Sequence, residues 1–119
     1  MQKERGFSFS PKVRDLAGKV MADGVLDFVR DADTLKAIID ILFAQALEHS
    51  KSFLPLVTGR SLMELITQQV LALDDEFGWD APGIGEERED QLLSWLVQRR
   101  VRQLIKRHLG EQALEGGVP

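Results

Sequence analysis

The chain contains no cysteine, and this absence excludes several kinds of chemistry at once. Without thiols there is no disulfide, no thiolate ligand for a metal and no cysteine nucleophile. A metal site would need histidine or carboxylate ligands, and the sequence has only two histidines, His49 and His108. Both are predicted near the ends of helices, where a cationic side chain interacts favourably with the helix dipole and a structural role is common.

The motifs of common enzyme and cofactor sites are also missing. There is no Gly-x-Ser-x-Gly motif, no Walker loop and no dinucleotide fingerprint, because Gly83 and Gly85 form only an isolated Gly-x-Gly. A calcium loop starting at Asp31 would need glycine and glutamate where the chain has Lys36 and Leu42. The sequence therefore predicts no catalytic residue, no metal ligand and no cofactor, and we expect the protein not to be an enzyme.

Long apolar runs are absent as well. No stretch of about 18 consecutive apolar residues occurs, so no transmembrane helix is predicted. Residues 1–10 are charged and polar where a secretory signal would carry an apolar segment. We therefore expect a cytoplasmic protein that does not associate with a membrane.

What the sequence does contain is enough apolar material for one domain. Its 119 residues are 44% hydrophobic, a length and composition typical of a single cooperative domain. There is no internal repeat and no long Ser, Gly or Pro tract that would mark a linker. We expect one helical domain over residues 1–119, with an extended arm at residues 1–10 and a C-terminal tail at residues 111–119.

The apolar spacing predicts an all-α bundle of about four helices. Residues 34–49 carry apolar side chains on more than one side, which is typical of a central helix that is covered by several others. Further helices are predicted over residues 11–29, 62–76 and 86–109. Their ends are indicated by Ser10 with Pro11, by a capping box of Ser61 and Glu64, and by Gly110.

Three connecting segments have predicted roles. In the arm, Phe7 and Phe9 share one side of an extended chain and either cover the core of their own chain or that of a second subunit. Residues 50–59 are predicted to be a loop that crosses the core. Residues 74–85 are predicted to be a structured loop, whose acidic side chains either remain in solvent or gather a hard cation.

Charge is divided unevenly along the chain, which has a net charge of −4. Residues 1–90 hold 10 Lys and Arg against 17 Asp and Glu, whereas residues 91–119 hold 5 against 2. In the predicted last helix, acidic residues come first and basic residues last, as the helix dipole favours. Four residues share one stripe of this helix, a tryptophan followed by a basic ridge: Trp95, Arg99, Arg102 and Lys106.

The stripe has three interpretations. It is a solvated or salt-bridged face, a surface for a protein partner, or a ridge that tracks the phosphates of a nucleic acid. A sequence pI near 5.1 argues against a dedicated DNA-binding domain.

The opposite side of the last helix is apolar over about half of its circumference. One neighbouring helix cannot cover so wide an arc, so a second neighbour is implied, either within the chain or from another subunit. We expect antiparallel self-association into a homodimer through four residues of this helix: Leu92, Leu96, Arg100 and Arg107. The sequence thus predicts a small protein–protein interaction or regulatory module, with a nucleic-acid-binding helical protein as the alternative.

Overall fold

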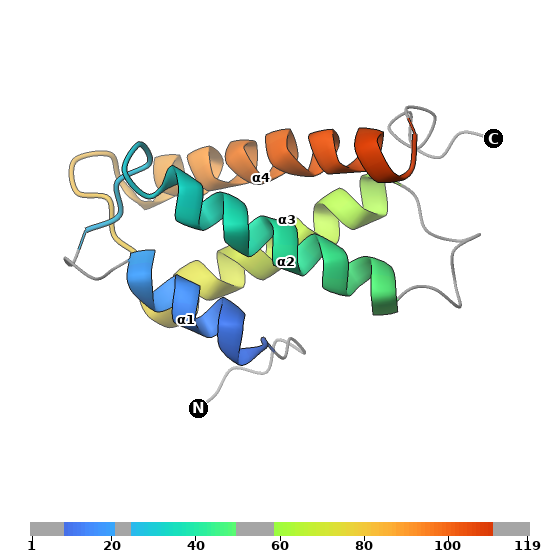
Figure 1. The fold of residues 1–119 in the computed structure, drawn as a ribbon. Helices are drawn as coiled ribbons and strands as arrows, with labels where there is room; N and C mark the ends of the chain where they lie inside the picture. Colours follow the sequence, from blue (N-terminus) through green and yellow to red (C-terminus); the bar gives the residue numbers. More distant parts are fainter. Residues whose placement is uncertain (1–8, 21–24, 50–58, 111–119) are drawn as a thin grey trace.

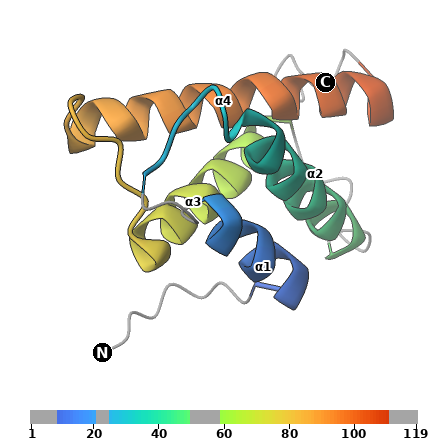
Figure 2. The same cartoon turned by 60° about the vertical axis from the view of Figure 1, so that its left-hand side comes forward.

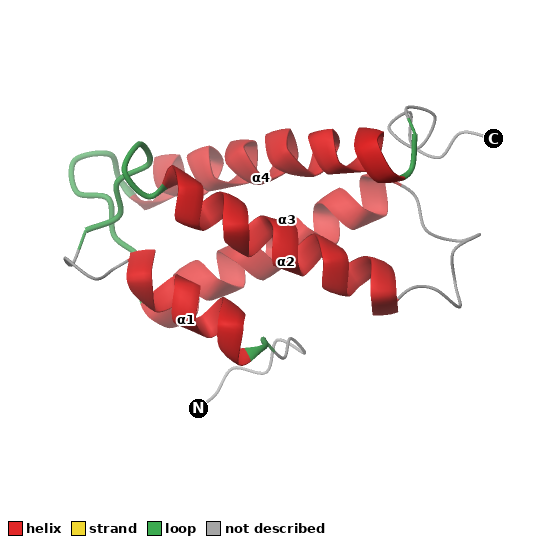
Figure 3. Ribbon diagram, viewed as in Figure 1, coloured by secondary structure: helices red, strands yellow, loops and turns green. Residues whose placement is uncertain are grey.

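The structure is a computed structural model that describes residues 9–20, 25–49 and 59–110. Within these residues the chain forms four α-helices and no strand (Figure 1, Figure 3). The helices are α1 (Pro11–Val20), α2 (Ala32–His49), α3 (Gly59–Phe77) and α4 (Glu86–His108). The prediction of an all-α bundle of about four helices is confirmed.

The helices pack around one cluster of buried apolar side chains. Helix α4 lies along one side of the molecule, α2 and α3 cross beneath it, and α1 packs on the side away from α4 (Figure 1, Figure 2). In the described part of the chain, α2 and α3 each contact all three other helices, whereas α1 and α4 do not touch. The central position is therefore shared by α2 and α3.

Helix α2 is buried as its apolar residues predict. Leu35, Ile38, Ile39, Leu42 and Phe43 are each no more than 3% exposed. Burying aliphatic and aromatic side chains of this size contributes about 1.5 to 3 kcal/mol each relative to leaving them in water. This helix therefore supplies much of the apolar material of the core.

The first helix is shorter than predicted. Helix α1 ends at Val20, and residues 25–31 form a non-helical segment followed by a turn. The Oδ1 atom of Asp27 accepts hydrogen bonds from the backbone N–H groups of Val29 (2.8 Å) and Arg30 (2.9 Å). Such side-chain acceptors compete with helical backbone hydrogen bonds, so the prediction of a helix to residue 29 was wrong.

The start of α3 also differs from the prediction. The helix begins at Gly59, so Ser61 and Glu64 lie within the helix, and its start is not at Ser61 as the predicted capping box requires. At α4 the prediction is confirmed almost to the residue. That helix begins at Glu86 and ends at His108, and Gly110 adopts a φ of 89°, a left-handed conformation that glycine reaches without strain.

The connection between α3 and α4 is structured, as predicted, but it begins at residue 78, because residues 74–77 of the predicted loop belong to α3. Trp79 is 4% exposed, and its Nε1 atom donates a hydrogen bond of 3.1 Å to the backbone carbonyl of Ala17 in α1. The backbone N–H of Leu26 donates to the carbonyl of Asp80 at 2.8 Å, which joins the two connecting segments at one end of the bundle (Figure 1, Figure 2). This loop therefore ties α1 to the α3 and α4 pair.

Three predictions fall wholly or mainly outside the described residues. They concern the arm up to residue 8, with Phe7, the loop at residues 50–58, and the tail at residues 111–119. Of the arm, the structure describes Phe9, which is partly buried and packs against the core of its own chain.

Candidate functional site on helix α4

Helix α4 has one buried side and one side that faces away from the bundle. Its apolar residues pack between α2 and α3 and are at most 4% exposed: Leu93, Val97, Val101, Leu104 and Ile105. Both helices that cover this arc belong to the same chain. The width of the arc therefore requires no second subunit.

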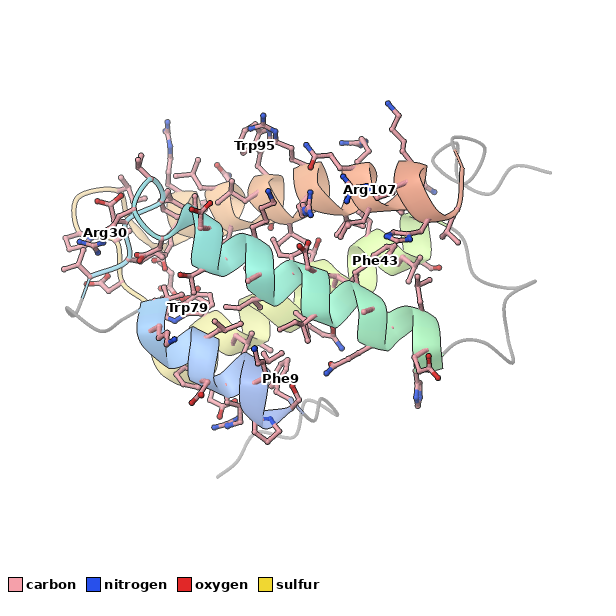
Figure 4. The ribbon with its side chains drawn as sticks, in the orientation of Figure 1. Phe9, Arg30, Phe43, Trp79, Trp95 and Arg107 are labelled. Atoms are coloured by element: carbon pink, nitrogen blue, oxygen red, sulfur yellow. The ribbon has the colours of Figure 1, made fainter. Side chains whose placement is uncertain are left out.

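Trp95 lies on the side of α4 that faces away from the bundle (Figure 4). Its side chain is 55% exposed, which makes it, with Val29 at 88%, one of the two most exposed large apolar residues of the described chain. The guanidinium carbon of Arg99 lies 5.4 Å from the centre of the Trp95 ring. This spacing is typical of a cation–π contact, in which the aromatic face attracts the positive charge.

The remaining basic residues of the predicted stripe are exposed beside this pair. Arg102 and Lys106 follow Trp95 at helical spacing, and both are exposed to solvent. Arg88, which the sequence analysis overlooked, is exposed two helical turns before Trp95 and extends the stripe toward the start of α4. Its spacing of seven residues from Trp95 was the signal that could have identified it. We call this surface the basic face of α4, made of Arg88, Trp95, Arg99, Arg102 and Lys106.

The residues predicted for self-association are not gathered on one free surface. Leu92 and Leu96 are partly buried, and Leu96 packs against the core. Arg107 is exposed. Arg100 is 14% exposed and forms an ion pair with Asp40 of α2, in which Nε and Nη2 donate to the two carboxylate oxygens at 2.7 Å and 3.0 Å.

This bidentate pair fixes α4 against α2. The Nη1 atom of Arg100 also donates to the amide oxygen of Gln103 at 2.9 Å, so the guanidinium group is held at three of its donors. Hydrogen bonding to Asp40 raises the pKa of Arg100 further above its already high value. Arg100 therefore has a structural role within the chain, which is to link α4 to α2.

A second group of interest is the pair of carboxyl groups where α3 meets α4. Glu89 is 4% exposed, and within the described part of the chain its Oε2 atom has no hydrogen-bond partner. Burial and the adjacent Glu89 raise the pKa of Asp74 to about 8, and the two side chains share a hydrogen bond. Burial also raises the pKa of Glu89, an effect that is partly offset by hydrogen bonds from Asp74 and the backbone of Ala81. The raised pKa of Asp74 favours a proton on this pair over two adjacent carboxylates.

The described residues contain no cluster of side chains that could hold a metal ion. Among residues 9–20, 25–49 and 59–110, no three histidine or carboxylate side chains are placed to hold a metal. The His108 ring lies 5.8 Å from the Phe43 ring, centre to centre, in a tilted packing arrangement. No described helix is both long enough and apolar enough to cross a membrane.

Comparisons of the chain with protein-family models, with curated proteins and with solved structures find no match.

Proposed function

We propose that the chain is a small cytoplasmic protein–protein interaction module that binds an acidic surface of a partner protein through the basic face of α4. The observation that carries the proposal is the exposed Trp95 ring with the Arg99 guanidinium stacked on it. No catalytic step is part of the proposal.

Tryptophan and arginine are the side chains that most often dominate the binding energy of protein interfaces. Trp95 offers a large apolar ring that gains free energy when a partner covers it. The ring is carried by a helix whose opposite side is locked into the core, so little backbone freedom remains to be lost on binding. Both features favour a binding surface over a face that is merely solvated.

The charge of the basic face supplies selectivity. Its Arg and Lys side chains stand on a chain whose net charge is −4, so the potential of the molecule is uneven. A local excess of positive charge increases the rate of association with acidic partners and disfavours basic ones. An acidic partner surface is therefore the complement of this face.

The proposal is tested by quantitative capture from an extract of the source organism. We expect Trp95→Ala and the pair Arg99→Ala with Arg102→Ala to lose the captured partner, because both remove part of the basic face. Lys12→Ala on α1 is the matched control, since Lys12 is exposed and α1 does not touch α4. Equal capture by all of these proteins would contradict the proposal.

Nucleic acid is the alternative partner, and the row formed by Arg99, Arg102 and Lys106 is the observation in its favour. If these three side chains bind phosphates, the logarithm of the binding constant should fall as the logarithm of the salt concentration rises, with a slope of about three times 0.9. Replacing all three with Gln would remove that dependence and weaken binding to every sequence alike. Absence of binding at low salt would end this alternative.

Self-association stays a prediction. The apolar arc of α4 no longer demands a second subunit, because α2 and α3 cover it, but Leu92 and Leu96 remain partly accessible. Light scattering at high micromolar concentration measures the oligomeric state directly. A monomeric wild-type chain would rule out the homodimer, whereas a dimer that Leu96→Glu converts into a folded monomer would support it.

A further inference from the structure

A groove runs between α2 and α4 beside the basic face. Its volume is about 230 Å³. Leu35, Ile39 and Leu96 form its apolar floor, and the polar rim includes Lys36 of α2 and Arg99 of α4. The groove is thus contiguous with the basic face, because Arg99 belongs to both.

Three positively charged side chains line the groove, of which one is engaged within the chain and two are without a described ion-pair partner. Arg100 also lines the groove, but its guanidinium group is engaged by Asp40 and Gln103. Lys36 and Arg99 are exposed, and neither forms an ion pair with another described residue. The rim also holds the carboxylate of Asp33, so the positive charges of Lys36 and Arg99 outnumber its single negative charge. The groove therefore favours anionic groups on either side of its apolar floor.

The size of the groove decides what kind of occupant it fits. Sites that enclose a whole small molecule usually have volumes of about 300 to 1,000 Å³. This groove is smaller than that range. It fits one large apolar side chain, with neighbouring residues of the same ligand lying across the rim.

We propose that the groove receives an apolar anchor side chain from an acidic segment of the partner protein, whose flanking carboxylates pair with Lys36 and Arg99. This inference rests on the proposed function, since it identifies the kind of segment that the partner presents to α4. The Arg100 and Asp40 pair connects the two walls, and the groove is present in the chain without a bound partner.

The probe for the first experiment is a set of three synthetic peptides of 12 residues. The acidic peptide carries one central Phe with two Glu on each side, the basic peptide has Lys in place of Glu, and the third has Ser in place of Phe. Each is titrated to millimolar concentration while the methyl NMR signals of Ile39 and Leu96 are recorded. We expect the acidic peptide with Phe to shift these signals and the other two not to do so.

Variants then test the role of charge. Lys36→Glu should weaken binding of the acidic peptide by about fivefold or more, because an attraction becomes a repulsion. Lys36→Glu with Arg99→Glu should reverse the preference and bind the basic peptide instead. Lys12→Glu, which changes the net charge of the chain as much as Lys36→Glu does, should leave the affinity unchanged. Methyl signals that do not move, that move equally with the basic peptide, or that move only outside the groove would overturn the inference.

The same variants separate this inference from the proposed function. If partner capture is lost with Trp95→Ala but kept with Lys36→Glu, the basic face binds the partner and the groove does not. If both variants capture the partner as the wild type does, both proposals fail. Loss of capture with both variants, together with the expected peptide preference, supports both. A dimer that disappears with Lys36→Glu would identify the occupant as a second copy of the chain and would also overturn the inference.

Discussion

At the scale of single residues, Trp79 joins two parts of the chain that lie far apart in the sequence. Trp79 lies in a loop that composition alone marks as structured, and unlike the exposed Trp95 it is buried. Its hydrogen bond to Ala17 joins residues 62 positions apart in the chain, and no local pattern encodes such a contact. The Asp74 and Glu89 pair escaped prediction for the same reason, because the two carboxyl groups meet only when α3 and α4 pack.

Trp79→Phe isolates the hydrogen bond from the packing of the ring. Phenylalanine keeps most of the buried apolar surface but leaves the Ala17 carbonyl without its indole donor. We expect a loss of about 1 to 3 kcal/mol in the free energy of unfolding, measured by urea denaturation. Trp95→Phe is the matched control and should change the free energy of unfolding by less than about 0.5 kcal/mol. Similar losses in the two variants would contradict a structural role for the Trp79 hydrogen bond.

Asp74→Asn tests the carboxyl pair through the pH dependence of stability. The pKa of Asp74 rises from its ordinary value of 3.8 to about 8 in the folded chain. Between these two values the folded state holds a proton that the unfolded state has lost, so the stabilising effect of that proton is complete below about pH 4 and falls as the pH rises toward 8. Asparagine resembles the protonated carboxyl and does not titrate.

We therefore expect Asp74→Asn to be more stable than the wild type at pH 8, with a difference that shrinks toward pH 5. Thermal unfolding at several pH values measures this difference. Asp15→Asn on the exposed side of α1 controls for the loss of one carboxylate and should show no such trend. A difference between Asp74→Asn and the wild type that does not vary with pH would show that Asp74 is ionised in the folded chain.

At the scale of helices, the sequence predicted well where the apolar period and the end signals agree. Helix α4 has acidic residues at its start, basic residues at its end and Gly110 just beyond, and its predicted bounds are confirmed. The first helix was extended too far because Phe28 continues its apolar spacing, whereas the Asp27 side chain fixes a turn there. Hydrogen bonds between side chain and backbone outweighed periodicity over those few residues.

Leu42→Ala tests the contribution of α2 to the core. Leu42 is 2% exposed and lies in α2, one of the two described helices that contact all three others. Removing its side-chain carbons should leave a cavity and cost about 2 to 5 kcal/mol of the free energy of unfolding. Leu65→Ala on α3 is the control, because Leu65 is 37% exposed. An unchanged melting temperature for Leu42→Ala would refute the central role of α2.

The attachment of α4 to α2 is tested by a double-mutant cycle on Arg100 and Asp40. Each single change, Arg100→Ala or Asp40→Ala, removes the bidentate ion pair. Because Arg100 is mostly buried and Asp40 is 39% exposed, we expect a coupling free energy of about 1 kcal/mol, near the upper end for ion pairs that contact solvent. A coupling free energy near zero would show that apolar packing alone holds the two helices at this spacing.

At the scale of the whole molecule, the core and the candidate site differ in how far the sequence determines them. The core follows from apolar spacing, which every helix carries in its own sequence. The groove beside α4 depends on how α2 crosses α4, and Lys36 lies 63 residues from Arg99. The basic stripe could be predicted because all of its residues lie on one helix. The groove could not, because it forms only where two helices pack together.

The two tryptophans of the chain stand in opposite surroundings, Trp79 in the core and Trp95 in solvent. Their ultraviolet emission therefore separates into a short-wavelength component, shielded from iodide quenching, and a long-wavelength component that iodide reaches. Unfolding shifts the first component, and covering of α4 by another molecule shields the second. The chain thus carries separate intrinsic optical reporters for the integrity of its core and for the occupancy of its outer helix.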